Sequence, residues 1–87
     1  IIMSQKLEIY KKKLLYRASY RGTKEMDILL TMFVKKYLDI FDEKQLKNLE
    51  KFLEFEDEVI KEFYNKGINK DDISKNPISS IFKNFKL

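Results

Sequence analysis

The sequence predicts an all-α protein that folds as a compact five-helix antiparallel bundle. Apolar residues recur at spacings of three and four along nearly the whole chain, and no stretch alternates with a period of two for long enough to form a strand. The 87 residues include seven Phe and five Tyr, which supply the side chains of a hydrophobic core. A chain of this length has room for one domain, so residues 1–87 are expected to form a single unit with residues 1–4 disordered.

The first two helices are expected to meet at a tight corner. The first should run from Gln5 to Tyr20, because four apolar residues fall on one of its faces: Leu7, Tyr10, Leu14 and Ala18. The lysines at 11–13 then lie largely on the solvent side. Gly22 fits the position just past this helix, where a left-handed backbone favours a residue without Cβ, and Thr23 is a suitable N-cap for the next helix.

The second helix, from Lys24 to Asp39 or Ile40, is the most apolar and is expected to be central. Its apolar residues cover more than one face: Met26, Leu29, Leu30, Phe33, Val34 and Tyr37. Aromatic residues from several helices are expected to pack together in the core: Phe33, Tyr37, Phe52, Phe63 and Phe82.

The third helix has the clearest start signal, in the sequence "FDEKQL" at 41–46. Asp42 is expected to be the N-cap, with Gln45 completing a capping box and Phe41 packing on Leu46 as a hydrophobic staple. The helix then continues through its apolar positions Leu46, Leu49, Phe52 and Leu53.

Two shorter helices complete the prediction. The acids of "EFEDEVI" at 54–60 suit the first turn of a fourth helix, since its N-terminal dipole favours negative charge, and Gly67 is expected to end it. A loop over 68–76 follows. Asn76 and Pro77 then suit the cap and first position of a short fifth helix with the apolar residues Ile78, Ile81, Phe82 and Phe85.

Composition excludes several classes of function. The chain has no Cys and no His, which removes thiolate nucleophiles, the commonest acid-base group and the usual zinc ligands. The acids at 54–58 lack the spacing of an EF-hand. We therefore expect no catalytic residues, no metal site and no enzymatic activity. The longest apolar run, at 28–34, is far shorter than the roughly 20 residues that span a bilayer, so no membrane insertion is expected.

Charge is distributed unevenly and leaves a rival hypothesis open. Residues 1–24 carry seven Lys or Arg against one acid, whereas residues 25–66 carry eleven acids against seven bases. The basic first helix favours an anionic partner, and the lysines at 11–13 fit either a solvated face or a docking surface. The rival is a small nucleic-acid-binding or regulatory protein whose basic helix contacts phosphates. A second rival, an enzyme with paired carboxylates, has no acid pair set in a visible pocket.

The sequence "SYRGTKEMD" at 19–27 allows two interpretations. Helix capping and first-turn acids account for Gly22, Thr23, Glu25 and Asp27 by local physics alone. Alternatively, the guanidinium of Arg21 beside a corner without Cβ presents a planar fork where another backbone can approach closely.

A family resemblance favours the second interpretation. Residues 21–27 match the Arg-Gly-x-x-Glu-(Leu or Met)-Asp signature of the succinate dehydrogenase flavinylation assembly factors, small helical proteins of proteobacteria and mitochondria. The sequence "FLEFEDEVIKEF" is similar to a second family segment at Phe52, Leu53, Asp57, Ile60 and Phe63. The chain departs from the family at Glu56, Val59 and Phe63, where proline, an acid and Trp are common, and at Tyr20, which is often basic.

The resemblance implies a partner and a set of contact residues. Proteins of this family promote covalent attachment of FAD to a histidine in the flavoprotein subunit of succinate dehydrogenase, and in some bacteria of fumarate reductase. The resemblance implies that Arg21 bonds to that partner, that Gly22 permits close approach, and that Glu25 accepts hydrogen bonds from the partner or orients Arg21. The partner-binding residues are then expected to be Arg17, Tyr20, Arg21, Gly22, Glu25 and Asp27, of which Asp27 fits a structural role equally well.

The resemblance also implies where the cofactor lies. With Gly22 and Gly67 as its only glycines, the chain has no G-x-G-x-x-G loop, so FAD is expected to be carried by the partner and not bound stably here. We expect a monomer that binds no nucleic acid. Its expected location is the bacterial cytoplasm, since neither a secretory signal nor an Arg- and Ser-rich presequence is seen.

Overall fold

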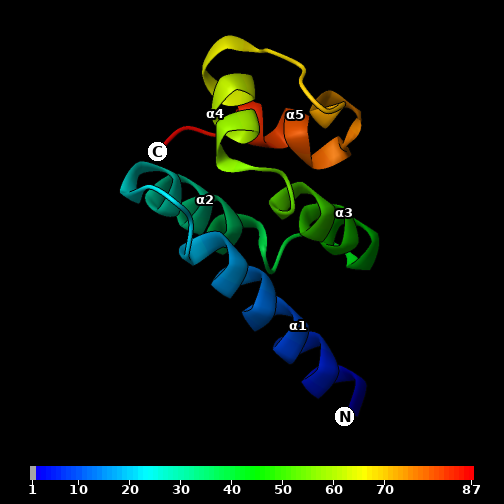
Figure 1. Ribbon diagram of the computed structural model, residues 1–87. Helices are drawn as coiled ribbons and strands as arrows, with labels where there is room; N and C mark the ends of the chain where they lie inside the picture. Colours follow the sequence, from blue (N-terminus) through cyan, green and yellow to red (C-terminus); the bar gives the residue numbers. More distant parts are fainter. Residues whose placement is uncertain (1) are drawn as a thin grey trace.

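The computed structural model describes residues 2–87 and contains five α-helices and one 3₁₀ helix (Figure 1). The elements are α1 (Ile2–Ser19), α2 (Lys24–Tyr37), α3 (Glu43–Leu53), α4 (Asp57–Lys66), η1 (Ile73–Lys75) and α5 (Pro77–Lys83). The all-α prediction is confirmed, and residues 2–87 contain no strand. Ile1 lies outside the described residues, and the disorder predicted for residues 1–4 stays a prediction.

The predicted boundaries of α1 and α2 shift. α1 begins at Ile2, earlier than the predicted Gln5. α2 ends at Tyr37, short of the predicted Asp39 or Ile40, because the carbonyl of Tyr37 accepts hydrogen bonds from the amides of both Ile40 and Phe41. These two bonds tighten residues 38–40 into a turn that leads directly to the cap of α3.

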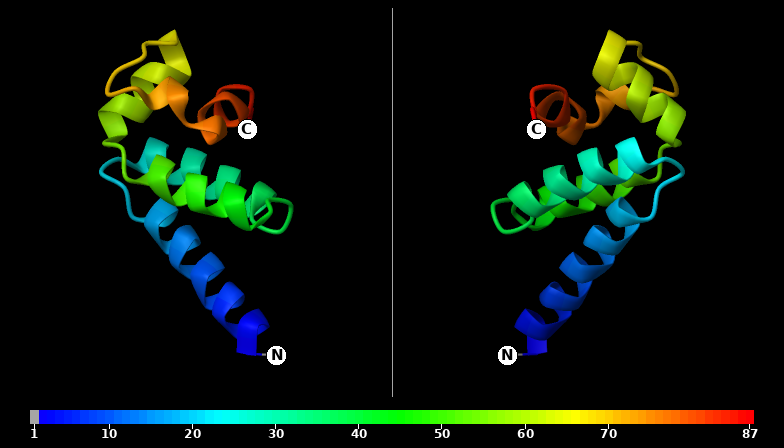
Figure 2. Two further views of the ribbon diagram at one scale, coloured as in Figure 1. Left: turned by 90° about the vertical axis from the view of Figure 1, so that its right-hand side faces the viewer. Right: turned by 90° about the vertical axis from the view of Figure 1, so that its left-hand side faces the viewer.

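The helices form three tiers that both Figure 1 and Figure 2 show. α1 forms one side, α2 and α3 lie side by side in the middle, and α4 and α5 form the other side. The N-terminal half of α1 projects beyond the body, and the molecule as a whole has extents of 43 × 26 × 20 Å. The Cα radius of gyration is 12.7 Å. A folded chain of this length is expected at about 12 Å, so the protein is compact despite the projection.

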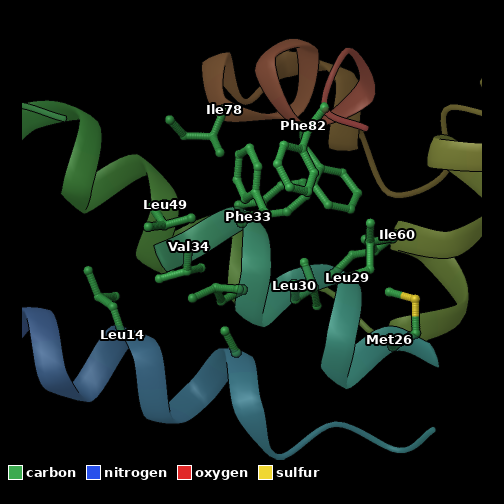
Figure 3. Close-up of a cluster of buried hydrophobic side chains, with 14 of the residues drawn as sticks. Leu14, Met26, Leu29, Leu30, Phe33, Val34, Leu49, Ile60, Ile78 and Phe82 are labelled. Atoms are coloured by element: carbon green, nitrogen blue, oxygen red, sulfur yellow. The ribbon is translucent and has the colours of Figure 1, made fainter. Parts of the chain in front are cut away.

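The core is centred on α2, as predicted. Figure 3 shows Phe33 pointing toward Phe82 of α5, while Leu14 of α1 lies on the opposite side of α2. The Phe33 ring is fully buried and lies within 6.5 Å, centre to centre, of five other rings: Tyr37, Phe41, Phe52, Phe82 and Phe85. The predicted core aromatics are all buried except Tyr37, which is half-buried at the edge. Aromatic packing therefore joins the middle tier to α5.

The caps predicted for α2, α3, α4 and α5 are confirmed. Asp42 and Gln45 form the complete capping box of α3, and Thr23 accepts from the amide of Met26 at the start of α2. Asn76 caps α5 with Pro77 at its first turn. Gly67 ends α4 in the left-handed conformation, with φ of 70°.

Polar bonds attach α1 to the middle tier. The Tyr10 hydroxyl donates to the Glu50 carboxylate at 2.7 Å, and Lys11 pairs with Asp39 at 3.0 Å. The Lys11 side chain is only 14% exposed, so the predicted solvent-facing position is wrong for this residue but holds for Lys12 and Lys13. The reason is a partner 28 positions away, which helix periodicity does not reveal. Among residues 2–87, none of the helices combines the length and the apolar character needed to cross a bilayer.

Replacing Gly67 tests the left-handed end of α4. Gly67→Ala is expected to lower the free energy of unfolding by about 1 kcal/mol, because a Cβ disfavours this φ although it would meet the Lys83 side chain only at ordinary van der Waals distance. Gly67→Asn should cost less, since Asn adopts left-handed backbone more readily. Urea unfolding of both variants checks this, and equal costs would contradict the explanation.

The Tyr10 bond predicts a loss of stability at high pH. Burial, and then the hydrogen bond to Glu50, raise the pKa of Tyr10 from 10.0 to about 12. Because the fold favours the protonated hydroxyl, its contribution is present below pH 10 and is lost as pH rises through 12. Tyr10→Phe is expected to cost about 1 kcal/mol at pH 7. Unfolding titrations from neutral pH upward should show the difference between wild type and variant shrinking over this window, and a constant difference would refute it.

Candidate functional site

The corner between α1 and α2 is held from inside by Arg21. All three guanidinium nitrogens donate hydrogen bonds to the junction of α3 and α4. Nε bonds to Oδ1 of Asp57 at 2.6 Å, and the two terminal nitrogens bond to the carbonyls of Leu53 and Phe55, each at 2.9 Å. The Arg21 side chain is only 10% exposed. Its fork is therefore used within the protein.

Gly22 is held by the same carboxylate. Its amide donates to Oδ2 of Asp57 at 2.7 Å, so the two oxygens of Asp57 bind successive residues of the corner. A Cβ built on Gly22 would lie 3.1 Å from Oδ2, which is tighter than an ordinary contact. This position therefore needs a residue without a side chain because the Asp57 carboxylate lies so close.

The left-handed conformation predicted for Gly22 is wrong. Within residues 2–87, positive φ occurs at Gly67, Asp71 and Asp72. α1 ends at Ser19, one residue before the predicted Tyr20, so two residues, Tyr20 and Arg21, separate its end from Gly22. The corner is closed by Asp57 from across the fold and not by a glycine cap on the helix.

Asp27 also belongs to the inner part of the corner. Its carboxylate accepts from the backbone amide of Arg21 across the turn. Asp27 is half-buried in the first turn of α2, where its charge also favours the helix start. Of its two predicted roles, the geometry supports the structural one.

The remaining predicted residues point outward. Tyr20 is 72% exposed, and both Gly22 and Glu25 are exposed. Within the described chain, the Glu25 carboxylate has no hydrogen bond or ion pair. Arg17 is exposed, and its Nη1 lies 3.6 Å from Oε2 of Glu50. It precedes Arg21 by four positions in the sequence. The structure thus separates the predicted residues into an inner pair, Arg21 and Asp27, and an outer set.

Asp57 is the site residue that sequence reasoning failed to single out. It was noted as a first-turn acid of α4 and as a match to a family pattern, and it does lie in that first turn. The signal that was missed is that Asp57 matches one family segment while Arg21 matches another. Only folding shows that the two side chains meet.

Comparison with known proteins agrees with this geometry. A sequence model of the family described as "flavinator of succinate dehydrogenase" matches residues 12–86, which include the whole corner and Asp57. The chain belongs to this family. The predicted resemblance is therefore confirmed, together with the association of the family with flavinylation and with succinate dehydrogenase.

Curated relatives carry consistent names. The chain is 43% identical over 47 residues to "Succinate dehydrogenase assembly factor 2, mitochondrial" of Danio rerio, and 40% identical over 48 residues to the protein of the same name in Scheffersomyces stipitis. These matches cover 54% and 55% of this chain. They span only 30% and 32% of the relatives' own lengths.

A third relative extends the range of organisms. "Succinate dehydrogenase assembly factor 2-B, mitochondrial" of Drosophila ananassae is 45% identical over 42 residues, covering 48% of this chain and 26% of the relative. No solved structure gives a significant match.

Removing the Asp57 carboxylate should destabilise the whole fold. Asp57→Ala leaves a largely buried guanidinium without its counter-charge and the Gly22 amide without its acceptor, so a loss of about 2–3 kcal/mol is expected. Glu58→Ala is the matched control, because Glu58 is the neighbouring first-turn acid and is exposed. Glu58→Ala should lower the free energy of unfolding by at most about 0.5 kcal/mol. Chemical unfolding compares the two, and equal losses would reduce Asp57 to an ordinary helix-start acid.

Proposed function

We propose that this chain is an assembly factor that binds the flavoprotein subunit of succinate dehydrogenase and promotes covalent attachment of FAD to it. The flavoprotein subunit of fumarate reductase is a second candidate partner. Family membership and the names of the relatives support the proposal. The observation that carries it is the corner itself, which is fixed internally by Arg21 and Asp57 and presents Gly22 and Glu25 outward.

The corner has the properties of a preorganised contact surface. Because its backbone is already tied to the α3–α4 junction, docking need not order a loop, and less of the binding free energy is lost to ordering. The missing side chain at Gly22 lets a partner backbone approach. Glu25 supplies a carboxylate that is free to accept hydrogen bonds from partner donors.

Arg21 acts, in this proposal, by positioning the corner. A direct bond from Arg21 to the partner was predicted, but its three nitrogens already donate within the protein. Its guanidinium then contributes to binding by fixing Asp57, whose other oxygen accepts from the Gly22 amide, while the Arg21 backbone amide donates to Asp27 at the start of α2. Glu25 and Gly22 make the contact.

The corner does not fit FAD as a bound cofactor. A dinucleotide site needs free backbone amides against its phosphates, and the Gly22 amide is occupied by a carboxylate that would repel an anion. Gly67, the other glycine, closes the end of α4. We propose that FAD is carried by the partner throughout.

The proposed action is not enzymatic. The chain contains no histidine to receive the flavin, and the reacting histidine belongs to the partner. A bound factor that holds the partner in the reactive arrangement accelerates bond formation by positioning alone, since orientation can account for several kcal/mol of a barrier. We also propose that the chain acts as a monomer in the bacterial cytoplasm. The nucleic-acid alternative gains no support from the family match.

Flavinylation in cells tests the proposal. A succinate dehydrogenase flavoprotein subunit is produced in cells that lack their own factor, with this chain in limiting amount, and covalent flavin fluorescence is read in denaturing gels. Wild type should restore the band. Glu25→Ala should slow its appearance roughly tenfold or more, because a charge-assisted hydrogen bond to the partner is lost.

Two controls make this assay specific. Glu43→Ala removes an exposed first-turn acid from α3 and should behave as wild type. Gly22→Arg should abolish the band, but a Cβ there also presses on Asp57, so its folding is checked by circular dichroism. If wild type restores no band while remaining folded, the proposed function is wrong.

A further inference from the structure

α1 carries apolar residues on its exposed outer face as well as on its buried inner face. Leu14 and Ala18 are buried against the middle tier, yet Ile9, Tyr16 and Tyr20 are 54%, 64% and 72% exposed. At about 100° per residue, Ile9 and Tyr16 lie within about 20° of one another and about half a turn from Leu14 and Ala18. Tyr20 follows the last residue of α1, and its ring lies 4.5 Å from that of Tyr16. These three exposed residues, with Lys12 and Lys13 between Ile9 and Tyr16, extend over about 16 Å and are here named the outer stripe.

The outer stripe has the composition of an interface centre with a basic rim. The rings of Tyr16 and Tyr20 lie 4.5 Å apart, which makes them one aromatic surface. Lys12, Lys13 and Arg17 line a shallow hollow together with Ile9 and Tyr16. Tyrosine is enriched among the residues that dominate binding energy at interfaces, whereas lone exposed apolar residues need no explanation.

We infer that the outer stripe is a second contact surface for the flavoprotein subunit, one that fits an apolar groove with an acidic rim on that partner. The inference rests on the proposed function. Tyr20 is the last residue of the stripe and directly precedes Arg21 and Gly22, so stripe and corner form one continuous surface. The corner sets the orientation of docking, and the stripe adds apolar area to it.

The charge of α1 argues against a second copy of this chain as the occupant. Within Ile2–Ser19, α1 carries five Lys or Arg and a single acid. A two-fold contact between outer stripes would place the lysines of one copy against those of the other, and like charges facing each other oppose such an interface. An acidic rim on a different protein is complementary to the same lysines.

Binding measurements with the purified partner test the stripe. The double variant Ile9→Ser with Tyr16→Ser should bind the flavoprotein subunit at least about tenfold more weakly than wild type. Ile40→Ser is the matched control, because Ile40 is 67% exposed in the α2–α3 turn, away from the stripe, and should change the affinity less than about twofold. Circular dichroism and urea unfolding should show all variants folded, since every altered side chain is exposed.

Charge reversal at the rim gives an independent readout. Lys12→Glu with Lys13→Glu should lower the association rate constant, and the difference from wild type should fade as salt is added, because rim charges steer encounter. An association rate that does not change at low salt would contradict the acidic rim.

The remaining outcomes separate the stripe from the proposed function. If Glu25→Ala weakens binding while the stripe variant binds as wild type, the stripe inference is overturned and the proposed function stands. If wild type neither binds the flavoprotein subunit nor restores the flavin band, both fail. Self-association in analytical ultracentrifugation, or binding of poly-U RNA, that is lost in the stripe variant would assign the stripe to another occupant and overturn the inference.

Discussion

The contact between Arg21 and Asp57 determines how two parts of this small fold that are distant in sequence are joined. It links the α1–α2 corner to the α3–α4 junction, 36 positions away. A largely buried ion pair often gains little net stability, because both groups lose water. Here the remaining donors of the guanidinium reach two backbone carbonyls, and the second carboxylate oxygen receives the Gly22 amide. Since most of the polar groups in this contact have hydrogen-bond partners, the ion pair fixes the geometry of the corner even where its net contribution to stability is small.

This arrangement explains why the seven-residue signature contains residues of two kinds. Arg21 and Asp27 turn inward and shape the backbone, whereas Glu25 is exposed and takes no part in holding the corner. Gly22 belongs to both groups, because its amide is bound internally to Asp57 while the residue is exposed at the surface. If the corner is the contact surface that we propose, a substitution in the inner group changes the shape of that surface, whereas one in the outer group changes only its chemistry. The proposed function can therefore be lost at these positions for two distinct physical reasons.

Local signals predicted most of the fold, and long-range contacts account for what they missed. The capping box of Asp42 and Gln45, the Thr23 cap and the glycine end of α4 depend on residues within five positions of one another, and all are confirmed. The errors at Lys11 and Gly22 each involve a carboxylate 28 or more positions away. The site was predicted as a set of residues, but its division into inner and outer groups depends on Asp57, whose distance from the motif hides the pairing.

The outer stripe was missed for a related reason. The inner residues of α1 and the stripe residues Ile9, Tyr16 and Tyr20 have the same helical spacing, so periodicity alone shows two apolar faces without saying which one is buried. The fold buries the face of Leu14 and Ala18 and leaves the other exposed. An exposed face of this kind raises the risk of association with wrong partners, and the flanking lysines reduce that risk by repelling basic surfaces and further copies of the chain. In the proposed function, a rigid corner beside a helix with charged and apolar residues combines fixed orientation with selectivity, which a factor that acts by positioning its partner requires.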